Sequence, residues 1–414
     1  MNKKYYETAA IMLLLGSFPA LFLPTLQFIL LIVLMGLVLS FRHPDRATLK
    51  QLLSFRYLAF AQFCILFFIN AVIYPVWDNP KAHYRAIALE SWSISLFCLI
   101  VLALWLNMRK ADDVKRAILY WLPVGLSVSF FVASWFYFLG DQGSRVTLFT
   151  PSPLTPPFWF LVLTAASFGW FFEMSHLHRA WRIAIFFMAG LMAVYGGARL
   201  VMLAWVLCGI VLMTWGCIQS DRKYRLRIFT GASLFGAVCV GGIILVDLLS
   251  EGGFLGRMAK FAQVEFSYES IGSQFLRAQI WSGALSIIPD NIWIGVGQVN
   301  ERAAISQEMD WDRWLRAHQT YLSYLIAGGI PALISGLIMQ SPMLIFLKRT
   351  KRSALFPVFL GLGVVVTLNC FTDSIFQSAV NVQVFMVTTL LFLRASDADQ
   401  PTLAPQKHVS SAII

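Results

Sequence analysis

The stretch RAHQTYLSYLIAGGIPALISGLIMQSPMLIF, residues 316–346, marks the point where a long polar segment ends and a long apolar one begins. From Gln319 to Phe346 it contains no charged side chain. A helix needs about 20 mostly apolar residues to cross the hydrocarbon core of a bilayer. Residues 319–346 are therefore predicted to span a membrane, and residues 250–318 form the one long polar interruption of the chain.

The rest of the chain repeats this apolar pattern. Apolar residues make up 58% of it and charged residues 13%, which is typical of a polytopic helical membrane protein rather than a soluble domain. About twelve segments reach or approach spanning length: residues 8–23, 25–41, 57–77, 86–106, 117–138, 158–174, 183–198, 200–218, 228–249, 319–346, 354–371 and 377–393. The predicted fold is all-α, with about 12 transmembrane helices and one large loop between spans nine and ten.

Basic residues predict the orientation of these spans. If the N-terminus lies inside, the short inner loops are residues 42–56, 107–116, 175–182, 219–227 and 347–353, and each of them carries Lys or Arg. This positive-inside pattern accounts for the net charge of +11 without nucleic acid as a partner. The predicted organisation is spans one to nine over residues 1–249, an outer loop over 250–318, spans ten to twelve over 319–394, and an inner tail over 395–414. The first apolar segment is expected to remain in the protein, since no Ala-x-Ala-like cleavage site closes it.

No metal site or cofactor is predicted. The six cysteines lie in or at the ends of predicted spans, without a CxxC pair, so neither a disulfide framework nor a zinc site is expected. Asp310-Trp-Asp312 has the short DxD form that many sugar transferases use to hold a metal on a nucleotide diphosphate. Nucleotide sugars are cytoplasmic, whereas this segment is predicted outside, so the metal role is disfavoured.

The outer loop contains one predicted surface helix. Apolar side chains recur at helical spacing over residues 275–288, and Pro289 is expected to end the helix. We expect this helix to lie on the membrane surface or on the bundle. Trp281 within it is interpreted as an interface anchor in preference to a platform for a sugar ring.

Two arginines are candidates for anion binding. Arg199 opens the eighth span from the outside, where a charge is costly unless it is paired, faces water or reaches the headgroups. Arg277 lies on the predicted surface helix, and its planar guanidinium matches phosphate oxygens, although a solvated helix charge is the plain alternative.

His318 is the sharpest candidate for catalysis. Imidazole can accept a hydroxyl proton near neutral pH, and this histidine stands where the outer loop meets the tenth span. The alternative is a histidine that only hydrogen-bonds the backbone. Five further polar residues near the ends of the outer segments are candidates for binding a phosphate group or the molecule whose hydroxyl loses the proton. They are Arg313, Arg316, Asp373, Gln319 and Tyr321. Glu90, within the fourth span, is predicted to be a buried charge.

These motifs together resemble an O-antigen ligase, of the superfamily that also contains the O-antigen polymerases. The matching segments are Gly-Gly-Ala-Arg199-Leu, Arg277-Ala-Gln-Ile-Trp281, Gly295-Val-Gly297, and His318-x-x-Tyr321-Leu322 followed by Gly328-Gly329-Ile330. Their order and their placement around one late outer loop carry the resemblance, which covers nearly the whole chain. One departure is Gln319, where the family often has asparagine after the histidine.

The resemblance implies a metal-independent glycosyltransferase of GT-C-like architecture in the bacterial inner membrane, with its active site on the periplasmic face. The donor would be undecaprenyl diphosphate carrying O-antigen, the acceptor a hydroxyl of the lipid A–core oligosaccharide, and membrane lipids would surround both. Arg199 and Arg277 would hold the diphosphate, and His318 would remove the acceptor proton. The nearest alternative is a polymerase, whose acceptor is a second carrier-linked glycan. A transporter or lipid flippase is the alternative from another class, although such proteins often consist of two similar halves.

Overall fold

The computed structural model describes residues 50–74, 83–139, 155–195, 199–219, 230, 268–310, 316–349, 355–372, 376 and 379–397. Within these ranges every regular element is a helix, so the predicted all-α class is confirmed. The predicted spans at 8–23 and 25–41, almost all of 228–249, and the tail beyond Asp397 lie outside the described residues.

Each predicted span inside the described ranges overlaps a helix. These helices are α4 (Phe55–Ile73), α5 (His83–Met108), α6 (Ala111–Leu139), α7 (Thr155–Ser167), α8 (His176–Tyr195), α9 (Arg199–Gln219), α14 (Thr320–Arg349), α15 (Phe356–Thr372) and α16 (Ala379–Ser396). The span predicted at 158–174, however, is helical in α7 only as far as Ser167, after which come a turn and the 3-10 helix η2 (Phe171–Glu173). By length and composition, five of the described helices can cross a membrane, namely α4, α5, α6, α9 and α14. The chain is therefore a multi-pass membrane protein.

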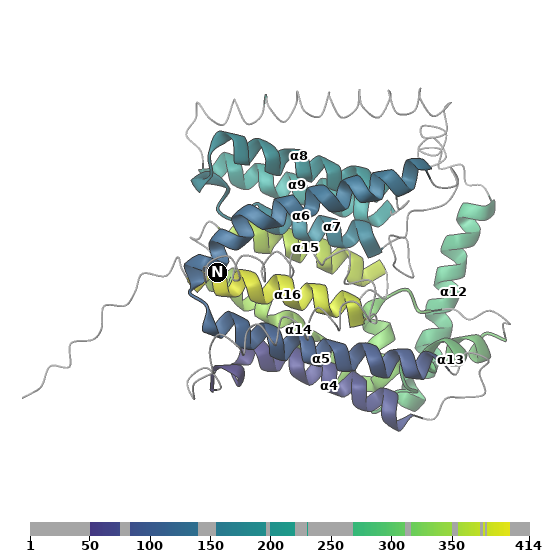
Figure 1. Ribbon diagram of the computed structural model, residues 1–414. Coiled ribbons are helices and arrows are strands. Elements are labelled where there is room, and N and C mark those ends of the chain that lie inside the picture. The colour runs from purple at the N-terminus through teal and green to yellow at the C-terminus, as the bar shows by residue number, and fades with distance from the viewer. Residues whose placement is uncertain are drawn as a thin grey trace, which may run out of the picture.

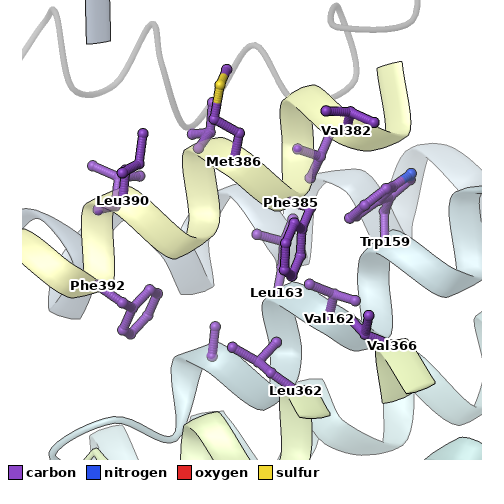
Figure 2. Packing of buried hydrophobic residues seen from close by; sticks show 14 of the residues in the cluster. Trp159, Val162, Leu163, Leu362, Val366, Val382, Phe385, Met386, Leu390 and Phe392 are labelled. Atoms are coloured by element: carbon purple, nitrogen blue, oxygen red, sulfur yellow. The ribbon is translucent and has the colours of Figure 1, made fainter. Parts of the chain in front are cut away.

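The spans form a bundle with α16 inside it (Figure 1). Every residue from Asn381 to Leu393 is buried, and most of them are apolar, as expected of a helix at the centre of a bundle. Figure 2 shows Phe385 of α16 close to Leu163 of α7, with Leu362 and Val366 of α15 beside them. A polar bond also joins these layers, because the Trp159 indole N–H donates to the Asn381 side-chain oxygen over 2.8 Å.

Prolines inside two spans leave backbone carbonyls that side chains satisfy. Proline has no N–H, so the carbonyl four residues earlier loses its helical donor. In α6 the carbonyl that Pro123 frees is Leu119, and it accepts a hydrogen bond from Arg182 of α8. In α14 the carbonyl that Pro342 frees is Ile338, and it accepts one from the Ser341 hydroxyl over 2.6 Å. Such repairs matter in a bilayer, where no water replaces the missing donor.

Two further helices, α12 (Tyr268–Asn291) and α13 (Glu301–Glu308), lie at one end of the bundle. Figure 1 shows α12 running across the direction of the spans. A small apolar core packs α12 and α13 against the start of α14; its buried members are Ile280, Ala284, Ile287, Ile288, Val296, Ala304, Ile305, Ala317 and Ile326. The expected surface helix is thus present and lies on the bundle.

The predicted bounds of this helix, 275–288, were too narrow. It begins at Tyr268 and continues through Pro289 to Asn291, so the expectation that Pro289 ends it was wrong. Pro289 lies in the last turn, where its missing N–H affects only the Leu285 carbonyl and does not stop the final residues from staying helical.

Candidate functional site

His318 lies two residues before α14, in a backbone conformation that few side chains adopt. Its φ angle is 51°, in the left-handed region, and its side chain is partly buried. A residue other than glycine in this region is uncommon, and it persists only where the surrounding contacts hold it there. The chain on either side of His318 is held by hydrogen bonds from α12, α13 and the first turn of α14.

Ala317, the residue before His318, is held on both sides of its backbone. Its carbonyl accepts a hydrogen bond from the Trp281 indole N–H of α12 over 2.8 Å. Its N–H donates to the carboxylate of Glu301 of α13 over 3.4 Å, and Ala317 itself is completely buried. Trp281 therefore positions the segment that carries His318. This role differs from the two considered from the sequence, an anchor at the membrane interface and a platform for a sugar ring.

Glu301 is a buried carboxylate that also contacts α14. Only 2% of it is exposed, and its Oε1 accepts a hydrogen bond from the Ser323 hydroxyl over 2.8 Å. On the same first turn, the Gln319 side-chain oxygen accepts a hydrogen bond from the Leu322 N–H. Gln319 thus caps α14, since an N-terminal cap satisfies a backbone N–H that lacks a helical partner. These bonds fix the chain directly before and after His318.

The two glycine motifs noted in the sequence meet in space. We call residues 292–298, between α12 and α13, the glycine loop. The N–H groups of Val296 and Gly297 donate to the carbonyls of Ile326 and Ala327 in α14, over 2.7 and 3.0 Å. In return the Ile330 N–H donates to the Ile292 carbonyl over 2.8 Å.

This exchange accounts for the break in α14 at Gly328 and Gly329, whose backbone angles are not helical. The Ile326 carbonyl would otherwise accept from Ile330, and the Ala327 carbonyl would face Pro331, which has no N–H. The glycine loop supplies both missing donors. Side chains do not fit here, because a Cβ on Gly295 or on Gly329 would lie 2.5 Å from backbone atoms of the opposite segment.

Polar residues of α4 and α5 secure the same junction. The Asn70 amide of α4 donates to the Ala327 carbonyl over 2.8 Å and accepts from the Gln298 N–H over 2.7 Å. The Trp92 indole of α5 donates to the Gln298 side chain over 2.9 Å. Asn70, Trp92 and Glu301 were not predicted from the sequence to be part of this site. For Asn70 a signal was present, because a polar amide inside an apolar span is expected to have a specific partner.

The other candidate residues are only partly described by the structure. Arg199 is the first residue of α9 and Arg277 lies in α12, but the structure describes only their backbones. Arg313, Asp312 and Asp373 lie outside the described residues. Arg316 is exposed two residues before His318.

The structure also describes the surroundings of Tyr321 and Glu90. The Tyr321 hydroxyl donates to the Gln340 side chain over 3.3 Å, and its ring contacts Phe371. Tyr321 therefore packs within the bundle in addition to any substrate contact. Glu90 is exposed on α5, so the prediction of a buried charge was wrong. Apolar content around a residue does not reveal which face of its helix it occupies.

A metal centre finds no support in the described part of the chain. There, no group of three or more His, Cys, Asp or Glu side chains lies close enough to hold an ion. Asp310 of the DxD pattern is exposed, with a φ angle of 51°.

Comparison with known proteins gives a family for this region. Residues 183–337 match the family described as O-antigen ligase. The match runs from α8 to the middle of α14 and so contains Arg199, Arg277, the glycine loop and His318. No curated protein matches the chain. The match over residues 183–337 supports an O-antigen ligase family assignment.

Proposed function

We propose that this protein transfers an O-antigen glycan from undecaprenyl diphosphate to a hydroxyl of lipid A–core, at the periplasmic face of the bacterial inner membrane. The observation that carries the proposal is the position of His318. It lies inside the family region, at the lip of a span, on a segment held by Trp281, Glu301 and the Gln319 cap. A fixed proton acceptor at the membrane surface suits a reaction between two lipid-borne substrates.

His318 acts as the general base in this proposal. It takes the proton from the acceptor hydroxyl as that oxygen attacks the anomeric carbon of the donor sugar. The bond from that carbon to the diphosphate oxygen breaks, and the configuration inverts. The products are the glycosylated lipid A–core, undecaprenyl diphosphate and a protonated imidazole, which later loses its proton to water.

Arg199 and Arg277 bind the diphosphate. Guanidinium groups match phosphate oxygens in geometry and charge, and they stabilise the negative charge that grows on the leaving group. The two helices α9 and α12 that carry them both belong to the family region. Because the leaving group already carries two phosphates, arginines are sufficient to stabilise it without a metal ion.

Complementation tests this function. A strain without its ligase, but with carrier-linked O-antigen, receives wild type, His318→Ala or His318→Asn, and lipopolysaccharide is examined on gels. We expect wild type to restore the ladder of glycan-bearing lipopolysaccharide and both variants, expressed at equal levels in the membrane, to lack it. A ladder that survives in both variants contradicts the role of His318.

The same assay separates a ligase from a polymerase. If wild type does not restore the ladder, it is expressed in a strain that lacks its polymerase but retains a ligase. Long glycan chains appearing only there would identify the second carrier-linked glycan as the acceptor and overturn the ligase proposal.

A further inference from the structure

The glycine loop is bonded to α14 at a point inside that span, and not at its end. Its partners in α14, Ile326 and Ala327, follow Thr320, the first residue of that helix, by six and seven residues. At 1.5 Å per helical residue this places the bonded loop about 10 Å along the span from its end. Asn70, which also bonds the loop, lies in the last turn of α4, a helix long and apolar enough to cross a membrane.

The backbone of this loop is suited to a place without water. Besides the bonds to α14, the Gly295 N–H donates to the Asn291 carbonyl over 2.7 Å, and the Ile294 carbonyl accepts from the Tyr74 hydroxyl. Irregular backbone is tolerated at membrane depth only where protein satisfies its polar groups. The N–H groups of residues 295–297 and the carbonyls of Ile292 and Ile294 therefore have protein partners.

The loop also presents two large apolar side chains away from the protein. Trp293 is 71% exposed and Ile294 is 67% exposed, whereas Gly295, Val296 and Gly297 are buried. The Tyr74 bond places Ile294 next to the end of α4, where Ile73 is 68% exposed. The apolar tip therefore continues the outward-facing apolar surface of a spanning helix.

We propose that the glycine loop is re-entrant and that Trp293 and Ile294 insert into the leaflet on the α12 side, against lipid acyl chains. An indole suits this place because it combines a large apolar ring with one N–H for the headgroup region. The partner is bulk bilayer lipid, as indicated by the continuity with the exposed face of α4. The proposal concerns membrane contact alone and is independent of the chemistry at His318.

Tryptophan quenching tests this contact on the full chain in lipid nanodiscs. The fluorescence of Trp293 is obtained as wild type minus Trp293→Phe, with lipids brominated along the acyl chain or with iodide in the water. Trp135 of α6, 66% exposed, provides the lipid-facing control as Trp135→Phe. Trp105 of α5, 1% exposed, provides the buried control as Trp105→Phe.

We expect brominated lipid to quench the Trp293 signal by a larger fraction than the whole-protein signal, as for Trp135. Trp293 quenched by iodide but not by brominated lipid would place the loop in water and overturn the proposal. Trp293 quenched by neither, like Trp105, would mean that protein covers it and would also overturn it.

A second measurement is independent of the tryptophan variants. Nitroxide labels on Ile294→Cys and on Asp290→Cys, an exposed position at the end of α12, are compared in a background without native cysteines. We expect the label at 294 to collide more with oxygen than with a water-soluble nickel chelate, and the label at 290 to show the reverse order. Equal nickel accessibility at the two positions contradicts insertion.

Discussion

At the scale of single residues, His318 joins a proton-accepting side chain to a backbone conformation with positive φ. A left-handed backbone costs roughly 1–2 kcal/mol for a residue with a Cβ but almost nothing for glycine. The surrounding bonds from Trp281 and Glu301 offset that cost. Strain kept at His318, the base in the proposed reaction, suggests that the direction of its imidazole matters for function.

The strain predicts an unusual order of stability between two variants that lack the imidazole. At an ordinary helical or extended position, glycine is less stable than alanine by about 0.5–1 kcal/mol. At position 318 we expect His318→Gly to be more stable than His318→Ala by about 1 kcal/mol, because only glycine adopts the positive φ freely. Thermal unfolding in detergent measures the difference, and an alanine variant more stable than the glycine variant would contradict the left-handed conformation.

Glu301 allows a test of how the His318 segment is positioned. Glu301→Gln keeps an oxygen that can accept from Ser323 and Ala317, whereas Glu301→Ala removes the acceptor of both donors. A buried donor that loses its acceptor costs about 1–3 kcal/mol. We expect the alanine variant to lose both stability and transfer rate, and the glutamine variant to stay within a few-fold of the wild-type kcat. Equal damage from both substitutions would show that the negative charge, and not the hydrogen bonds, is required.

At the scale of elements, the central feature is the junction of the glycine loop with the break in α14. Neither segment satisfies its own backbone, and each supplies what the other lacks. The broken helix and the loop are therefore expected to form and to open together. Asn70 and Trp92 extend the same unit to α4 and α5.

Gly329 provides the sharpest test of this junction. A Cβ there would lie 2.5 Å from the Ile292 carbonyl, at a φ of 64°. We expect Gly329→Ala to lower the free energy of unfolding by about 2–4 kcal/mol, from overpacking and positive φ together. The matched control is Gly363→Ala in α15, where the nearest atom is a Met343 methyl at 3.8 Å, and it should be neutral or slightly stabilising. Similar melting temperatures for the two variants would contradict the close approach.

The hydrogen bond from Arg182 to α6 predicts that substitutions of Arg182 and Pro123 have non-additive effects on stability. Arg182 donates to the Leu119 carbonyl, whose helical donor Pro123 removes. Arg182→Met should destabilise the protein by about 1–3 kcal/mol. In a Pro123→Ala background the loss should be smaller, because the substituted alanine restores the helical N–H. A double-mutant cycle of unfolding free energies measures this coupling, and additive losses would show that Arg182 acts elsewhere.

At the scale of the whole molecule, orientation decides whether His318 meets periplasmic substrates. The basic loops predict that His318 lies outside and the connection between α5 and α6 inside. Arg316 and Lys110 are both exposed and represent the two sides. We expect a membrane-impermeant maleimide to label Arg316→Cys in cells with a permeable outer membrane, and to label Lys110→Cys only after lysis. The reverse pattern would refute the orientation and with it the proposed function.

Sequence alone determined the class of this protein and the approximate position of its described spans. An apolar run of about 20 residues has few alternatives in water or lipid, so hydropathy identifies each span locally. The glycine motifs and His318 could also be recognised in the sequence. Helix ends were less predictable, as the extension of α12 through Pro289 illustrates.

Which of these segments meet depends on the three-dimensional packing of the chain. Hydrogen bonds join residues 292–297 to residues 326–330, which lie about 30 positions further along the chain. Others join Trp281 and Glu301 to Ala317. The spacing of apolar residues along the chain does not predict such bonds, because any backbone N–H can pair with any carbonyl that folding brings near. Burial is decided in the same way, and so Glu90, in an apolar segment, remained exposed while Glu301, in a polar one, became buried.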